Sequence, residues 1–107
     1  MKFKMNNCFY EIKEVSQEEL QREIVDEEDG YYYGQTKFIK QIVFIDKDLS
    51  VERKRKTLIH ELTHVYIREY LTTRDISQDE EVLCDINANC HNIIHEIVED
   101  YFKNKKD

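Results

Sequence analysis

The stretch TLIHELTHVY, residues 57–66, determines most of what this sequence predicts. It contains two histidines four residues apart, His60 and His64, with Glu61 directly after the first. On an α-helix, residues i and i+4 lie about 40° apart and one turn along, so both imidazoles can reach the same metal ion. Glu61 lies beside them, close enough to reach a metal-bound water without being a ligand itself. The HExxH pattern therefore predicts two zinc ligands and one general base on one helix.

A catalytic zinc site needs a third protein ligand from another part of the chain. The next predicted helix opens with EEVLCD, in which Glu81 and Asp85 share a face at i, i+4 spacing. We predict that Glu81 is the third ligand and that Asp85 accepts a hydrogen bond from a ligating imidazole. Glu80 points about 100° away from Glu81 and is not preferred, because it has no carboxylate four residues on. His91 and His95 lie about 15 and 21 Å along that helix, too far to share the ion, and are interpreted as polar-face residues.

The segments around the motif alternate between strand and helix patterns. Residues 1–15 alternate apolar and polar side chains, and Asn6-Asn7 suits a tight turn between two strands because Asn tolerates positive φ. The other expected elements, in chain order, are a helix over 17–28 with Ser16 as its N-cap, strands over 31–38 and 41–46, the motif helix over 51–71, a polar loop over 72–79 and a last helix over 79–103. The order ββαββαα predicts an α+β fold, with a small antiparallel sheet packed on the HExxH helix and the C-terminal helix.

Two apolar faces are expected to build the core. On the motif helix they are Leu58, Leu62 and Val65, flanked by Ile59 and Tyr66. On the last helix the apolar residues recur at helical spacing: Val82, Ile86, Cys90, Ile93, Ile97 and Tyr101.

Length and composition indicate one domain spanning residues 1–107. Hydrophobic residues make up 40% and charged residues 36%, with no apolar run near the length of a membrane span and no signal-peptide pattern at the start. Cys8, Cys84 and Cys90 are an odd number of cysteines without an export signal, which favours reduced thiols, and we expect a cytoplasmic location. None of them forms a CxxC pair, so a thiolate zinc site is not expected.

Charge gives a weak indication of the partner. The net charge of −7 makes a nucleic acid a poor first candidate. The basic run Arg53-Lys54-Arg55-Lys56 is either a solvated face near the start of a helix or a docking patch for an acidic or polynucleotide partner.

HELTH followed by a helix with the pattern E-x-x-x-D resembles the gluzincin branch of zinc peptidases. More narrowly, it is similar to the ImmA/IrrE group of small metallopeptidases, and the run from residue 46 to 102 looks like small phage-borne or mobile-element members. The resemblance implies a minimal zincin core, with Zn²⁺ held by His60, His64 and Glu81, and Glu61 as general base. Two departures are Thr63, where many members have Gly, and Cys84-Asp85, where Ala-Asn is more usual.

The resemblance also implies a function. A zinc endopeptidase would use Glu61 to take a proton from the metal-bound water as it attacks a peptide carbonyl. Its substrate would be a specific protein, such as a helix-turn-helix repressor of a mobile element. One alternative is a zinc-stabilised anti-repressor that binds its partner and cuts nothing, which would keep the metal ligands but would not need Glu61. A second alternative is a metal-free interaction domain in which the helical histidines occur by chance.

Overall fold

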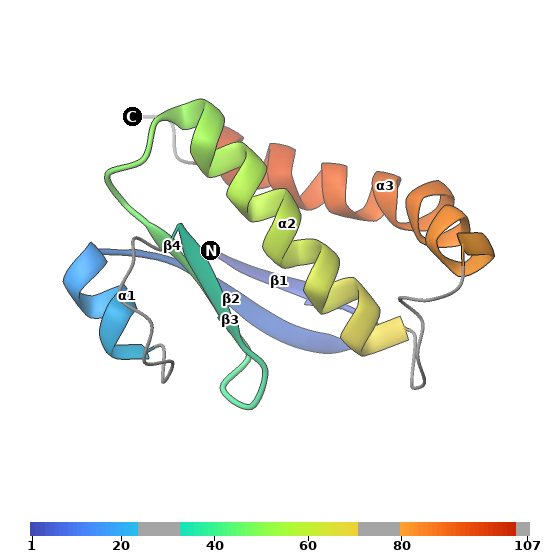
Figure 1. Ribbon diagram of the computed structural model, residues 1–107, viewed down its shortest axis with the longest axis horizontal. Coiled ribbons are helices and arrows are strands. Elements are labelled where there is room, and N and C mark those ends of the chain that lie inside the picture. Colours follow the sequence, from blue (N-terminus) through green and yellow to red (C-terminus); the bar gives the residue numbers. More distant parts are fainter. Residues whose placement is uncertain (24–32, 71–79, 105–107) are drawn as a thin grey trace.

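A computed structural model describes residues 1–23, 33–70 and 80–104, and describes only the backbone of residues 80–89. Its centre is a four-stranded sheet in the order β1-β2-β4-β3, and two long helices, α2 and α3, pack over one face (Figure 1). The strands are β1 (Lys2–Met5), β2 (Cys8–Val15), β3 (Gly34–Lys37) and β4 (Ile42–Asp46). The helices are α1 (Gln17–Glu23), α2 (Val51–Tyr70) and α3 (Glu80–Asn104). The predicted α+β class is confirmed; the part of the expected first helix beyond residue 23 and the expected loop over 72–79 lie outside the described residues.

The sheet is mixed, which corrects the expectation of an antiparallel one. β1 with β2 and β3 with β4 are antiparallel, but β2 and β4 run parallel, with Glu11 opposite Ile42 and Val15 opposite Asp46. Parallel neighbours need a crossover connection, and the chain between these two strands provides it. Apolar alternation indicates a strand but not the direction of its neighbour, so the sequence pattern did not distinguish the two arrangements.

The turn between β1 and β2 has the predicted form. Asn6 and Asn7 have φ values of 49° and 66°, the left-handed conformation that a two-residue hairpin turn requires. The same turn is fastened to the end of α2, because Asn6 Nδ2 donates to the Glu69 carbonyl oxygen at 2.7 Å and the Asn6 amide donates to Tyr70 Oη at 3.0 Å. These two hydrogen bonds join the β1–β2 turn to the C-terminal end of α2.

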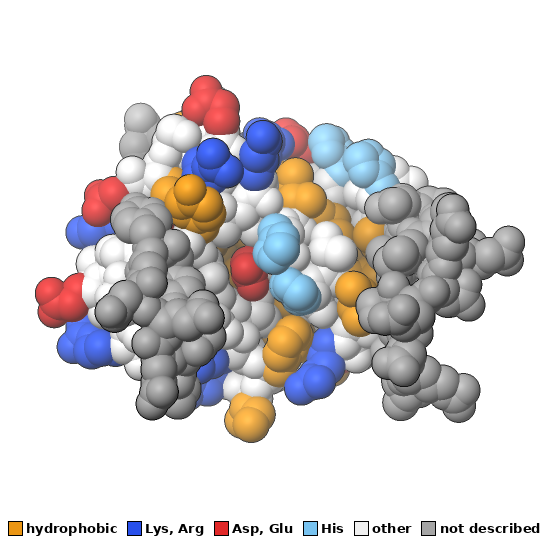
Figure 2. All heavy atoms as spheres, in the orientation of Figure 1, with side chains coloured by type: hydrophobic (Ala, Val, Ile, Leu, Met, Phe, Trp, Pro, Cys, Tyr) orange, Lys and Arg blue, Asp and Glu red, His pale blue; other side chains and the backbone are white. Residues whose placement is uncertain are grey.

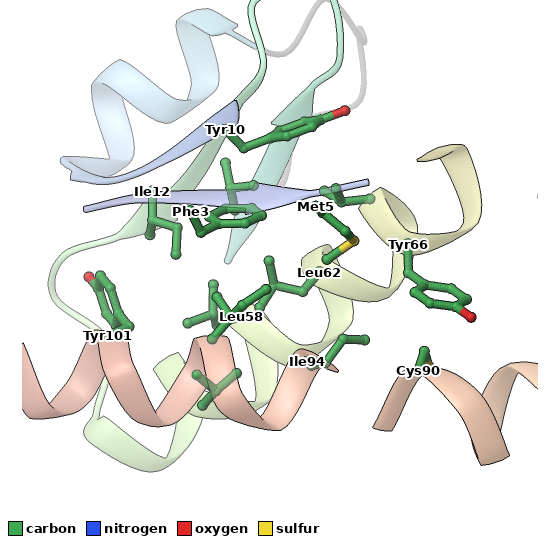
Figure 3. Packing of buried hydrophobic residues seen from close by; sticks show 14 of the residues in the cluster. Phe3, Met5, Tyr10, Ile12, Leu58, Leu62, Tyr66, Cys90, Ile94 and Tyr101 are labelled. Atoms are coloured by element: carbon green, nitrogen blue, oxygen red, sulfur yellow. The ribbon is translucent and has the colours of Figure 1, made fainter. Parts of the chain in front are cut away.

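Helix α2 begins and packs as its sequence predicts. Ser50 Oγ accepts a hydrogen bond from the Arg53 amide at 3.1 Å, which caps the first turn. Leu58, Leu62 and Val65 are fully buried against the sheet and α3 (Figure 3). Ile59, expected to flank this face, is instead 42% exposed, because it lies about 100° round the helix from Leu58.

Strand β4 and helix α3 contribute further buried side chains to the core. Val43 and Ile45 face the long helices, whereas Phe44 faces the opposite side of the sheet and packs with Leu20 of α1. Helix α3 buries five residues in the described part of its length: Cys90, Ile94, Ile97, Val98 and Tyr101. Ile94 and Val98 were not among the expected core residues; Ile93, which was, is partly buried, and the side chains of Val82 and Ile86 lie outside the described residues.

A partly buried polar contact joins three elements. Glu14 of β2 accepts a hydrogen bond from Tyr101 Oη of α3 and a 3.0 Å charged hydrogen bond from Lys54 Nζ of α2. Burial and the neighbouring carboxylate both raise the pKa of Tyr101 well above that of a free tyrosine.

Tyr101→Phe should lower the free energy of unfolding by about 1.5–3 kcal/mol, because it removes a hydrogen bond to a charged group. The raised pKa means that the folded state holds the Tyr101 proton more tightly than the unfolded state does, so wild-type stability should fall as the pH rises above about 10. The variant should lose less stability over the same range. Urea unfolding at pH 7.5 and pH 10.5 measures both effects, and an identical alkaline loss in the two proteins would contradict this assignment.

Candidate functional site

The two histidines of the motif converge on one point beside the sheet. His60 and His64 lie on consecutive turns of α2, both side chains are exposed, and their Nε2 atoms are 3.3 Å apart. The rings are steeply inclined to one another, with centroids 4.9 Å apart and an interplanar angle of 77°. Two ring nitrogens therefore point to the same volume of solvent rather than to partners in the core.

This spacing can be compared with that of a zinc site. Two nitrogens bound tetrahedrally at about 2.0–2.1 Å from one zinc ion must lie about 3.3–3.4 Å from each other. The observed Nε2–Nε2 distance of 3.3 Å falls in this range. Neutral imidazole is also a ligand that zinc accepts readily. The pair fits zinc both in chemistry and in spacing.

Glu61 is held in a different way from the histidines. Its side chain is only 8% exposed, and Thr36 Oγ1 on the edge strand β3 donates to Glu61 Oε1 at 2.6 Å. In the described part of the structure Oε2 has no hydrogen-bond donor. One carboxylate oxygen is thus fixed by the sheet while the other stays available for a proton. Thr36 was not among the residues selected from the sequence.

Gly34 allows β3 to lie this close to α2. A β-carbon at this position would lie 2.8 Å from Thr57 Cγ2, 2.9 Å from the Phe44 carbonyl oxygen and 3.5 Å from Glu61 Cγ. The first two distances are shorter than van der Waals contact, so any larger residue would push the strand away from the helix. Gly34 is the first residue of β3, and the sequence alone does not show that α2 passes next to it.

A cleft of about 410 Å³ opens beside these groups. It is lined by Tyr33, Gly34, Arg53, Lys56, Thr57, His60 and Glu61. Figure 2 shows the same face, with exposed histidine side chains beside a recessed carboxylate near its centre and Lys and Arg side chains over the N-terminal half of α2. The cleft places a carboxylate, an imidazole and two cations around one concave surface.

The expected third ligand cannot be placed. The backbone of Glu81 and Asp85 belongs to the start of α3, but their side chains lie outside the described residues. Among the side chains that the structure does describe, no group of three His, Cys, Asp or Glu converges as a metal site. His91 and His95 lie exposed on α3 with their rings stacked 5.9 Å apart, in keeping with polar-face residues.

An HExxH helix packed on a small sheet, next to a short edge strand, is the arrangement of a zincin-like domain. The family model described as the IrrE N-terminal-like domain, of the peptidase family M78, matches residues 14–105, and the chain belongs to this family. No curated protein and no solved structure gave a significant match. The family defines the chain as a metallopeptidase-type domain, for which the expected substrates are proteins. In the described part of the chain no helix has an apolar stretch long enough to cross a bilayer.

Proposed function

We propose that this chain is a single-domain zinc endopeptidase in which His60, His64 and Glu81 hold the metal and Glu61 is the general base. The observation that carries the proposal is the combination of two neighbouring features on α2. The imidazole nitrogens are 3.3 Å apart, and the carboxylate between them in sequence is buried and held by Thr36. A structural glutamate on a solvated helix face would need neither burial nor a donor from the neighbouring strand.

The residues of the chain would divide the reaction as follows. When bound, zinc supplies Lewis acidity, which makes a water easier to deprotonate and a carbonyl easier to attack. Glu61 Oε2 takes the proton of the attacking water, while Oε1 continues to accept the hydrogen bond from Thr36 Oγ1. The same carboxyl group then gives that proton to the departing amine nitrogen. Asp85 would accept a hydrogen bond from one of the two histidines and so fix its orientation.

The edge strand β3 is the proposed support for the substrate. The Asp46 amide donates to the Tyr33 carbonyl oxygen at 2.9 Å, so the antiparallel register turns the backbone groups of Gly34 and Thr36 away from β4. Extended peptides bind to such open edges by adding a strand. A substrate paired with these two residues would lie directly beside Glu61. A specific protein, such as a DNA-binding repressor of a phage or another mobile element, is the proposed substrate.

Metal content tests the proposal most directly. The protein is purified without a His-tag or added metal, and zinc is measured by atomic emission. About one zinc per chain is expected in the wild type and almost none in a His60→Ala/His64→Ala variant. Cleavage of a denatured protein mixture should stop with a chelator and return with zinc. A wild type that binds no zinc even after addition would refute the proposal.

Thr36→Val should lower the kcat of cleavage about ten-fold, the expected cost of one hydrogen bond to the base. Valine keeps the shape of threonine and removes only the hydroxyl. Thr36→Ser, which retains the hydroxyl, should recover most of the rate, and zinc content should be equal in all three proteins. A kcat that Thr36→Val leaves unchanged would show that Glu61 needs no donor from β3.

A further inference from the structure

The four basic residues 53–56 form two pairs that lie on different sides of α2 in the folded chain. Lys54 and Arg55 form ion pairs with other elements of the fold. Lys54 Nζ lies 3.0 Å from Glu14 Oε1, and Arg55 Nη1 lies 2.5 Å from Glu99 Oε2. Arg53 and Lys56 point to the other side of α2 and line the cleft that contains His60 and Glu61. The pattern follows from helical geometry, because residues 53, 56 and 60 recur at i, i+3 and i+7.

The two cations of the cleft have no acidic partner in the described part of the chain. Arg53 is held over the Tyr33 ring, with its Cζ 4.9 Å from the ring centroid, so the guanidinium is positioned at the cleft wall rather than free in solvent. Lys56 lies one turn before His60 and is exposed. Among the described residues that line the cleft, Glu61, the proposed general base, is the only one with a carboxylate. The cleft therefore offers two positive charges to whatever occupies it.

The distance of Arg53 and Lys56 from the HExxH motif limits where a carboxylate of a bound polypeptide would lie. At about 1.5 Å per residue, Lys56 and Arg53 lie about 6 and 10 Å along the helix from His60. An extended chain advances about 3.3 Å per residue. A carboxylate on a bound polypeptide would therefore meet these cations about two or three residues from the bond next to His60 and Glu61.

We propose that Arg53 and Lys56 select protein segments that carry Asp or Glu within about three residues of the scissile bond. The inference rests on the proposed peptidase function and adds a substrate class to it. A polypeptide is favoured over a nucleic acid for two reasons. The chain as a whole carries a charge of −7, which repels an extended polyanion, and the described lining of the cleft contributes two cations, too few for a polyanion. The overall negative charge also repels acidic proteins at long range. The proposed preference for Asp and Glu is therefore a local property of the cleft and concerns one or two carboxylates of the substrate.

Cleavage specificity gives the first test. The zinc-loaded protein is incubated with a proteome-derived peptide mixture, and the cut bonds are read by mass spectrometry. Asp and Glu should be enriched several-fold within three residues of the cut in wild type, and Arg53→Glu/Lys56→Glu should replace this with enrichment of Lys and Arg. Lys2→Glu/Lys13→Glu changes the net charge equally, on exposed positions of β1 and β2, and should keep the wild-type pattern. Loss of the acidic enrichment in this control, or its absence in wild type, would overturn the proposal.

Binding gives a second test that does not depend on hydrolysis. The affinity of the zinc-loaded Glu61→Gln variant is measured for two pools of fluorescein-labelled ten-residue peptides of random sequence. One pool has glutamate at two fixed positions, and the matched pool has glutamine at the same positions. The glutamate pool should bind about ten-fold more tightly, the expected effect of two partly exposed ion pairs, and Arg53→Gln/Lys56→Gln should remove the difference. Equal affinities would refute the acidic preference, and tighter binding of a fifteen-residue oligothymidine would assign the cations to nucleic acid instead. A wild type that cuts nothing while keeping the binding difference would refute the peptidase function alone.

Discussion

Glu61→Gln should reduce kcat for peptide cleavage by about 10²–10⁴-fold, the usual contribution of a positioned general base. Glutamine has nearly the same shape and can still accept the hydrogen bond that Thr36 Oγ1 now donates to Oε1. It cannot take a proton from water, however. Since Glu61 is proposed as a base and not as a ligand, the variant should bind zinc as well as the wild type does. Initial rates on a peptide found to be cut, with zinc measured on the same samples, provide the comparison.

The same variant separates the peptidase from the alternative of a zinc-stabilised anti-repressor. A binding module would keep its activity towards its partner when Glu61 becomes glutamine, because only the ligands matter to it. Loss of repressor inactivation in Glu61→Gln, together with unchanged zinc content, would identify cleavage as the activity. Retained inactivation with no cut product would favour the binding module.

Glu81→Ala should weaken zinc binding by more than about 100-fold, beyond the loss expected for a residue that only supports a ligand. Glu80→Ala is a matched control, because it removes the same group one residue away, on a different side of the predicted ligand helix. It should change zinc affinity by less than about two-fold. Asp85→Ala should cause an intermediate loss of about 10–100-fold. Competition with a chromogenic chelator gives all three affinities.

The outcome of this series assigns the third ligand. A large loss in Glu80→Ala with none in Glu81→Ala would exchange their roles and leave Asp85 without a reason to be near the metal. Equal, small losses in both would exclude these two glutamates as the third ligand, and a large loss in Asp85→Ala would then assign that role to Asp85. The folding of each variant is checked by circular dichroism, since α3 also supplies part of the core.

Local signals allowed much of the fold to be predicted. The motif helix was expected over 51–71 and runs from Val51 to Tyr70, because its apolar spacing and its serine cap lie within a short stretch of chain. The asparagine turn was equally clear, since its residues tolerate the positive φ that they adopt. In both cases neighbouring residues carry all the information that determines the structure.

The contacts around Glu61 could not be predicted in this way. Thr36 lies 25 residues before Glu61, and their hydrogen bond depends on the position of β3 at the edge of the sheet. That position follows from the parallel pairing of β2 and β4, which no local pattern encodes. Gly34 stands out in the sequence only once α2 is known to pass next to it. The proposed zinc ligands come from side-chain spacing, whereas the support of the base comes from topology.

The edge position of β3 has a consequence for the lifetime of the arrangement around Glu61. This strand has four residues and pairs with β4 on one side, whereas β4 is covered on both faces. Short edge elements open at a lower free energy than the core does, so β3 should detach in brief local unfolding events while the central strands β2 and β4 stay paired. During each event Glu61 loses its donor from Thr36. The fraction of time in which the carboxylate is correctly held is then set by one strand, and a polypeptide that paired with β3 would lengthen it.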